Sequence, residues 1–210
     1  MSILEPRIYL ASRSPRRREL LAQIGVRFDV LLFRSGQRFD QEVDEAVVSN
    51  ETPDQYVVRV ARAKAEHGLR LATSRQMLSR QMLSRPILAA DTTLDIDGEI
   101  VGKPADGAEA GAILARLSGC SHRVLTAIAV AEGDRLEHVL NVSEVRFRIL
   151  DAEEIRRYVV SGEPMDKAGA YGIQGRAAMF VAEIRGSHSG IVGLPLCETA
   201  LLLRRFGYPL

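Results

Sequence analysis

The stretch between Ile87 and Pro104 combines the pattern of a buried strand with a carboxylate and a lysine. Four apolar residues, 87–90, lead directly to Asp91, where a carboxylate is costly to desolvate unless a metal, a hydrogen-bond donor or a cation compensates it. Asp97-Gly98 predicts a tight hairpin turn, which would carry Lys103 back toward that carboxylate. A carboxylate at a strand end with a lysine nearby suits a metal–phosphate site. The alternative is an aspartate that caps a turn beside a solvated lysine.

A second candidate site lies where the first predicted strand, 7–11, meets the first predicted helix. Ser14 is a good N-cap residue, and Pro15 fits the first position of a helix. The free backbone N–H groups and the dipole of such a helix favour an anion. Two serines and four arginines surround this point: Ser12, Arg13, Ser14, Arg16, Arg17 and Arg18. The sequence therefore predicts a phosphate-binding loop, with an exposed basic first turn as the alternative.

Two more polar side chains could face a ligand. A helix that starts at Thr52, where Thr52 and Gln55 can form a capping box, places Lys64 in line with its buried stripe. That lysine either reaches solvent along its stem or meets an anion inside. Three glycines in the stretch 166–175 let the backbone approach a ligand, and Gln174 offers a donor and an acceptor suited to a base edge. The alternative is a plain glycine-rich connection.

The order of the elements predicts an α/β protein. Predicted strands and helices alternate along the chain, with antiparallel hairpins among them, which indicates a mixed central β-sheet with helices packed on it. No linker rich in Pro, Ser or Gly divides the chain, so we expect a single domain over residues 1–210. Finer expectations are a strand over 28–33, a strand over 177–184, a loop over 186–190, and a surface loop lengthened by the SRQML duplication at 74–83.

The composition argues against several classes of protein. Lys and Arg total 28 against 27 for Asp and Glu, and a net charge of +1 gives no field suited to gripping nucleic acid. The two cysteines, Cys120 and Cys197, form neither a disulfide framework nor a CxxC pair, and the four histidines lack zinc-ligand spacing. No segment approaches the ~20 apolar residues of a membrane span. We therefore expect a cytoplasmic protein with no membrane or nucleic-acid partner.

Six stretches of the chain stand out together: LASRSPRRRELLAQIG at 10–25, VDE at 43–45, YVVRVARAKA at 56–65, ADTTLDIDGEIVGKP at 90–104, SGEPMDKAGAYGIQG at 161–175 and VGLPL at 192–196. In this order they resemble the signatures of the Maf family of nucleoside triphosphate pyrophosphatases. The YGIQG form resembles the branch that acts on dTTP and UTP rather than the branch that acts on 7-methyl-GTP. The resemblance implies a Maf/ITPase-like fold with helices on both sides of the sheet, and a possible homodimer.

The resemblance also implies roles for individual residues in hydrolysis to a nucleoside monophosphate and pyrophosphate. Asp91 would be the catalytic general base, and Glu45 together with Asp91 would hold a divalent metal cation, Mg²⁺ or Mn²⁺. Taken alone, the acidic group that contains Glu45 is typical of a solvated loop. Substrate specificity would depend on Arg16, Thr92 and Gln174. The triphosphate-binding residues would be Ser12, Arg16, Lys64 and Lys103.

The sequence departs from the family pattern at one wall of the expected site. His188-Ser189-Gly190 stands where a G-S-Y-x-N form would place Tyr and Asn, which affects the pocket wall near 186–190. Two alternative functions stay open. One is a pyrophosphatase for deaminated purine triphosphates on a similar fold. The other is a non-enzymatic inhibitor of septum formation that acts by binding a partner, because Maf proteins are also linked to that process.

Overall fold

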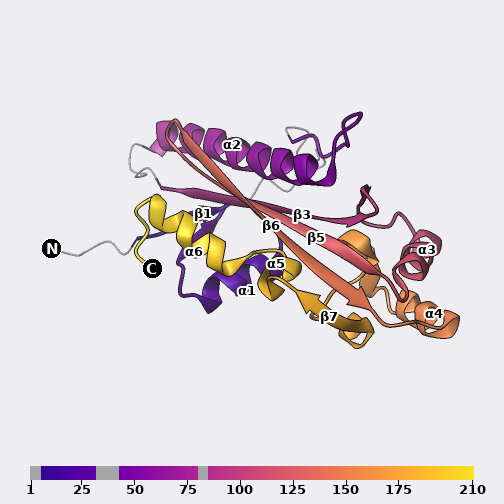
Figure 1. Ribbon diagram of the computed structural model, residues 1–210. Coiled ribbons are helices and arrows are strands. Elements are labelled where there is room, and N and C mark those ends of the chain that lie inside the picture. The colour runs from indigo at the N-terminus through magenta and orange to yellow at the C-terminus, as the bar shows by residue number, and fades with distance from the viewer. Residues whose placement is uncertain (1–5, 32–42, 80–84) are drawn as a thin grey trace.

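The computed structural model describes residues 6–31, 43–79 and 85–210, and within them one mixed β-sheet runs through the molecule (Figure 1). The strand order is β2-β1-β3-β5-β6-β7, with β4 paired to β3. β1 is parallel to both of its neighbours, and the other pairs are antiparallel. The strands are β1 Ile8–Leu10, β2 Phe28–Val30, β3 Ile87–Ile96, β4 Glu99–Val101, β5 Ser121–Glu132, β6 Arg135–Phe147 and β7 Val181–Arg185.

α1 and α2 begin at the capping residues that the sequence predicts. Ser14 accepts a hydrogen bond from Arg17 N at the start of α1, and Thr52 and Gln55 exchange the two bonds of a capping box at the start of α2. The helices are α1 Pro15–Gln23, α2 Pro53–Ser79, α3 Gly107–Leu117, α4 Ala152–Val160, α5 His188–Val192 and α6 Leu196–Arg205. Short 3₁₀ turns lie at Glu163–Asp166, Ala168–Ala170 and Arg176–Phe180. No helix in the described part of the chain is long and apolar enough to cross a membrane.

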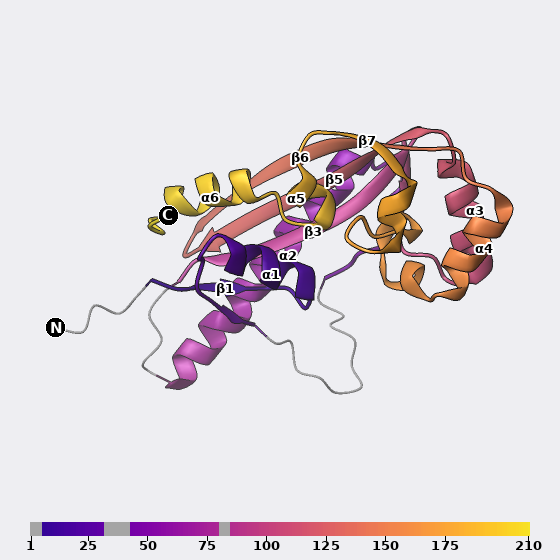
Figure 2. The ribbon, with the colours of Figure 1, turned by 90° about the horizontal axis from the view of Figure 1, so that it is seen from below.

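Helices cover both faces of the sheet, as predicted. The long helix α2 packs on one face, where small residues such as Ala61 and Ala65 meet the alanines of β3 and β5 (Figures 1 and 2). α1 and α6 cover the opposite face, with Leu21 and Leu202 buried against Leu88 and its neighbours. α3 and α4 lie together at one end of the sheet (Figure 2), around a third group of buried side chains that includes aromatic rings.

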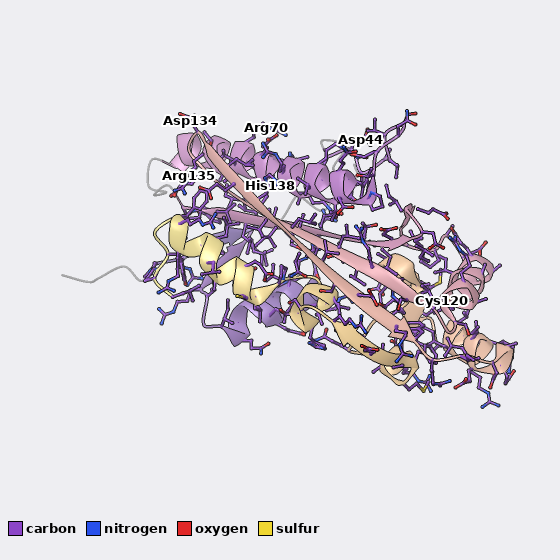
Figure 3. All side chains as sticks on the ribbon, viewed as in Figure 1. Asp44, Arg70, Cys120, Asp134, Arg135 and His138 are labelled. Carbon is purple, nitrogen blue, oxygen red and sulfur yellow. The ribbon has the colours of Figure 1, made fainter. Side chains whose placement is uncertain are left out.

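The β5–β6 hairpin is the longest regular feature of the sheet. Its turn, with Asp134, and Cys120, just before β5, lie toward opposite ends of the molecule (Figure 3). All twelve residues of β5, from Ser121 to Glu132, pair with β6, and most of β5 is buried because helices cover both of its faces. The hairpin is therefore the platform on which β3 and its polar residues are held.

A gap in the sheet beside β3 sets the position of Asp91. Within β3, only Ile87 and Leu88 pair with β1, and on the same side of β3 the pairing with β4 begins at Leu94. Between these points, residues 89–93 have a strand neighbour only in β5. The sequence analysis placed Asp91 at the end of the strand that starts at Ile87. In the structure β3 continues past Asp91 to Ile96. The neighbouring strand β1 is the one that ends near this point, with its last residue, Leu10, opposite Leu88.

Three other local predictions were wrong in part. The first SRQML copy and Ser79, which opens the second copy, continue α2 rather than lengthening a loop, and 80–84 fall outside the described residues. The expected strand over 177–184 begins as a 3₁₀ turn, and β7 starts only at Val181. Of the strand expected over 28–33, Phe28–Val30 forms β2, and 32 and 33 lie outside the described residues.

Candidate functional site

A cleft of about 1600 Å³ opens at the gap beside β3. Its lining combines the start of α1, part of α2, the middle of β3, the β4–α3 connection and the glycine-rich segment after α4. All of the site residues that the sequence predicts line this one cleft: Ser12, Arg16, Glu45, Lys64, Asp91, Thr92, Lys103 and Gln174. The fold therefore brings together side chains that are as much as 162 positions apart in the sequence (12 to 174).

Asp91 and Glu45 converge on the ammonium group of Lys64. Lys64 Nζ lies 2.7 Å from Asp91 Oδ1 and 2.7 Å from Glu45 Oε1. Asp91 is 8% exposed, so its charge is compensated by a cation as the sequence analysis required. Lys64 lies on α2, and its predicted alignment with the buried stripe points it at the carboxylate rather than at solvent.

Glu45 is exposed, but side chains of α2 fix its backbone. Tyr56 Oη donates to Glu45 O at 3.1 Å. The guanidinium of Arg59 donates to Asp44 O at 2.9 Å and to Ala46 O at 2.8 Å. Burial raises the pKa of Tyr56 to about 12, so its hydroxyl remains a donor at neutral pH. Three consecutive carbonyls are thus tied to the helix that carries Lys64.

The two carboxylates form a donor set suited to a hard divalent cation. Mg²⁺ is usually bound through one or two carboxylates together with phosphate oxygens of the substrate. Glu45 and Asp91 both reach the same ammonium, so they are close enough to share a cation. Among the described residues, no group of three or more His, Cys, Asp or Glu side chains is placed so that it could hold a metal ion. A metal here would therefore depend on ligands from the substrate or water as well.

The start of α1 forms a cationic wall opposite Asp91. Ser12 Oγ accepts from Ser14 N at 3.2 Å, which folds the loop against the helix N-terminus. Arg16 is partly exposed, and its Nη1 lies 3.7 Å from Asp166 Oδ2 across the cleft. Lys103 is exposed at the cleft and makes no ion pair with any residue that the structure describes. Both cations are placed to meet an anionic ligand.

Arg17 also lines the cleft. The sequence analysis named it only as one of four arginines near the start of the first helix and assigned it no role of its own. Its guanidinium donates to Gly193 O at 2.8 Å, to Ser12 Oγ at 3.2 Å and to Thr92 Oγ1 at 3.3 Å. Burial lowers the pKa of Arg17, and the nearby charge of Asp91 opposes that shift. A signal was present, because Arg17 lies three and four positions before the buried Leu20 and Leu21 on α1.

The glycine-rich segment presents Gln174 over a rigid base. Glu163 accepts hydrogen bonds from Tyr158 Oη at 3.0 Å and from Arg176 N at 3.1 Å. A side chain on Gly175 would collide with the Glu163 carboxylate, so glycine is needed for the close approach. Gln174 itself is exposed and lines the cleft, and its amide hydrogen-bonds to none of the described residues. The segment therefore leaves a free amide facing the ligand space.

The segment that departs from the family pattern is a short helix rather than the expected loop. Ser187 caps α5 by accepting from Gly190 N at 3.0 Å. A side chain on Gly190 would collide with Asn141 Oδ1, so the β6 amide occupies the space that a larger residue there would need. The cleft wall is built from the next residues, Ile191, Val192 and Gly193.

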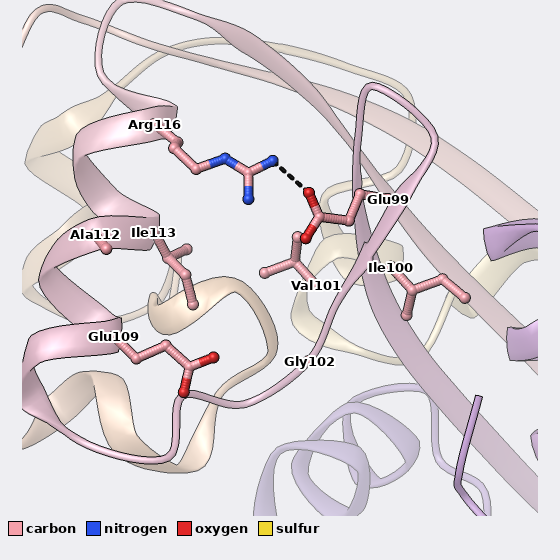
Figure 4. A pocket seen from close by; sticks show the side chains of 8 residues that line it. All are labelled: Glu99, Ile100, Val101, Gly102, Glu109, Ala112, Ile113 and Arg116. Atoms are coloured by element: carbon pink, nitrogen blue, oxygen red, sulfur yellow. Dashed lines mark hydrogen bonds and ion pairs between the residues drawn. The ribbon is translucent and has the colours of Figure 1, made fainter.

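A second, smaller hollow of about 190 Å³ lies between β4 and α3 (Figure 4). Its two most prominent charges are already paired, because Arg116 Nη2 lies 2.7 Å from Glu99 Oε2. This hollow contains none of the predicted site residues. The chemistry of the molecule is therefore concentrated in the large cleft.

Fold and cleft together define an α/β protein whose mixed sheet has a gap beside a cleft lined by cations and two neighbouring carboxylates. The chain belongs to the Maf family: the family model described as Maf-like protein matches residues 7–206. A protein of Dechloromonas aromatica (strain RCB) named dTTP/UTP pyrophosphatase is 59% identical over 202 residues, which cover 96% of this chain and 98% of that protein. A protein of the same name from Aromatoleum aromaticum (strain DSM 19018 / LMG 30748 / EbN1) is 57% identical over 211 residues and the full length of both chains.

Proposed function

We propose that this protein hydrolyses dTTP and UTP between the α and β phosphates, releasing the nucleoside monophosphate and pyrophosphate. The observation that carries the proposal is the convergence of Lys64, Asp91 and Glu45 in one cleft with a cationic helix N-terminus and the free amide of Gln174. The relatives that bear the name dTTP/UTP pyrophosphatase support the same reaction.

The cations of the cleft would stabilise the charge that develops during the reaction. Cleavage of the α–β bond moves negative charge onto the leaving pyrophosphate. Arg16, Lys103 and Lys64 line the cleft, where fixed positive charges lower the energy of the transition state more than that of the bound substrate. Ser12 would add a hydroxyl at the helix N-terminus, where backbone N–H groups favour a phosphate.

Asp91 would act as the general base on the attacking water. Lys64 binds Oδ1 at 2.7 Å, and none of the described residues donates a hydrogen bond to Oδ2. That second oxygen is therefore available to accept a proton from water, a step that contributes ~10²–10⁴-fold to rates in other enzymes. Lys64 holds the carboxylate in place, because the ammonium is itself fixed between two carboxylates.

Glu45 and Asp91 would hold a divalent cation, Mg²⁺ or Mn²⁺, together with the triphosphate. Such an ion supplies Lewis-acid neutralisation of phosphate charge. Gln174 would read the base. Thymine and uracil present the same O2, N3–H and O4 edge, and an amide offers both a donor and an acceptor to it. The proposed selectivity for these two bases follows from that shared edge.

The test is to incubate the purified protein with Mg²⁺ or Mn²⁺ and, separately, dTTP, UTP, CTP, ITP and 7-methyl-GTP, and to identify the products. Monophosphate and pyrophosphate from dTTP and UTP are expected. A preference for ITP would instead favour a pyrophosphatase for deaminated purines, and turnover of none of the five would refute the proposal.

Asp91→Asn keeps the size of the side chain and removes its basicity. We expect kcat for dTTP to fall by about 10²–10⁴-fold with an unchanged circular dichroism spectrum. Asp97→Asn is the matched control, because Asp97 lies on the same hairpin, exposed and outside the cleft. Its positive φ of 54° is one that asparagine also tolerates. Equal activity in the two variants would remove Asp91 from its role.

A further inference from the structure

We infer that Thr126 is a positioning residue that fixes the hydroxyl of Thr92 as a hydrogen-bond acceptor toward the cleft. In that state Thr92 selects a base with a donor at N3, as in uracil and thymine, over cytosine, whose N3 is an acceptor. The inference rests on the proposed function and extends it. Thr126 lies on β5 directly opposite Thr92 on β3, is fully buried and does not line the cleft.

A continuous line of hydrogen bonds runs from α1 through the sheet to α5. Arg17 Nη2 donates to Thr92 Oγ1 at 3.3 Å. Thr92 Oγ1 and Thr126 Oγ1 are 2.9 Å apart. Thr126 Oγ1 donates to Gly190 O at 2.8 Å. The line therefore begins at a guanidinium and ends at a backbone carbonyl.

The two ends fix the direction of every proton between them. A guanidinium only donates and a carbonyl only accepts, whereas a hydroxyl has one proton and two lone pairs. Since Thr126 gives its one proton to Gly190 O, it must accept from Thr92. Thr92 in turn gives its one proton to Thr126 and accepts from Arg17. One lone pair is left on Thr92, and no proton.

This leaves Thr92 unable to bind a phosphate through its hydroxyl. Ionised phosphate oxygens only accept hydrogen bonds, so they offer nothing to a group with no proton to give. Thr92 lines the cleft, and the partner that suits its remaining lone pair is a donor on the nucleoside. The imide N3–H of uracil and thymine is such a donor. Cytosine would place a lone pair against a lone pair at the same position.

The same segment secures both ends of the line. Gly190 O, in the middle of α5, accepts from Thr126, and Gly193 O, just beyond the end of α5, accepts from Arg17 Nε at 2.8 Å. Gly190 O also accepts from Gly193 N at 3.0 Å, so it is the close contacts between oxygens that fix the two protons. If Thr126 turned its proton away from Gly190 O, or Thr92 turned its proton into the cleft, two oxygens would face each other at 2.8 or 2.9 Å with no proton between them. Such a contact is costly, so the arrangement is stable in the absence of ligand.

The test compares Thr126→Val, which removes the hydroxyl at nearly constant volume, with Thr126→Ser, which keeps it. The measurement is the ratio of kcat/KM for UTP to that for CTP. We expect Thr126→Ser to retain the ratio of the unmodified protein and Thr126→Val to reduce it by roughly tenfold, the scale of one hydrogen bond. An equal loss on both substrates, with the ratio unchanged, would mean that Thr126 only packs, and would overturn the inference.

A second measurement needs no variant. UTP methylated at N3 lacks the donor, whereas 5-methyl-UTP carries an added methyl group and keeps it. We expect the unmodified protein to turn over 5-methyl-UTP but to lose at least tenfold in kcat/KM on the N3-methylated compound, and equal turnover of the two would overturn the inference. If the unmodified protein hydrolyses neither dTTP nor UTP, the proposed function itself fails. That result is distinct from an unchanged ratio in Thr126→Val.

Discussion

Two neighbouring arginines at the start of α1 differ in what they contact. Arg17 is half-buried, and its guanidinium gives its hydrogen bonds to protein acceptors, Gly193 O, Ser12 Oγ and Thr92 Oγ1. Arg16 is partly exposed, and its nearest ion-pair partner among the described residues is Asp166 at 3.7 Å. We therefore expect Arg17 to organise the cleft and Arg16 to meet the ligand.

This difference predicts different effects on stability. Arg17→Met keeps the aliphatic stem but removes the guanidinium donor from Gly193 O and Thr92 Oγ1, whereas Ser12 Oγ keeps its bond from Ser14 N. An unsatisfied buried polar group costs about 1–3 kcal/mol. For a chain of this size each kcal/mol lowers Tm by roughly 2–4 °C. Arg16→Met should leave Tm nearly unchanged, because a long ion pair at a partly exposed site contributes little. Equal shifts of Tm in the two variants would contradict the distinction.

The sequence points to candidate site residues, which the fold gathers in one cleft, more readily than to the residues that these contact. Asp91, Lys64 and Gln174 stand out because each is a polar group in an apolar or glycine-rich context. Thr126 could not be found that way, since a threonine within an apolar β-strand is also an ordinary strand residue. Its importance depends on register, and the pairing of Thr92 with Thr126 becomes visible only when β3 and β5 are aligned.

At the scale of elements, the 3₁₀ turn Glu163–Asp166 supports the segment that carries Gln174. The carboxylate of Glu163 is held by Tyr158 Oη and Arg176 N, so it cannot move aside without losing these bonds. The sequence analysis expected the glycines of this segment to let the backbone approach a ligand. What the sequence could not reveal is that Gly175 approaches Glu163 of the protein itself.

Gly175→Ala should therefore displace Gln174. The added methyl group would collide with the Glu163 carboxylate, and a misplacement of about 1 Å can reduce kcat/KM by up to about 10²-fold. We expect a rise in KM for dTTP with little change in Tm, because residues 174–176 are exposed. Gly111→Ala on α3 is the control, since a methyl group there meets no atom within 4 Å. Normal kinetics in Gly175→Ala would show that the segment adapts freely.

Element boundaries were the least predictable part of the fold. β3 runs without a break through Asp91 and Thr92 because β5 pairs with both of them, although the carboxylate of Asp91 suggested that the strand ended there. α2 extends to Ser79 although its last residues repeat a polar motif. In both cases the backbone follows hydrogen-bonding partners that lie far away in the sequence.

At the scale of the whole molecule, His122 makes stability depend on pH. Its side chain is buried between the rings of Phe147 and Tyr171, and its Nε2 lies 2.8 Å from Tyr171 Oη, the titratable group that faces it. Burial lowers the pKa of His122 from 6.5 to about 4. The folded state therefore holds His122 neutral, and the unfolded state takes up the proton first as the pH falls.

The corresponding loss of stability is confined to acid conditions. Above about pH 6.5 the effect is absent, and below it the free energy of unfolding decreases until the pH reaches about 4. At 1.36 kcal/mol per pH unit, the decrease from pH 6.5 to pH 5 is about 2 kcal/mol. Urea unfolding at pH 7.5 and pH 5 should show this extra loss in the unmodified protein and not in His122→Gln. The same pH dependence in both proteins would assign the effect to other groups.

The hydrogen bond from Arg17 Nε to Gly193 O joins residues 176 positions apart. The β5–β6 hairpin, in contrast, closes through the two-residue turn Gly133-Asp134. Contacts between distant residues carry the larger loop-closure cost and tend to form later in folding. We therefore expect the hairpin to form early and the cleft to be completed last. The regions that form last and depend on few contacts are also those that open most readily in the native state, and a cleft that must admit and release a nucleotide benefits from that property.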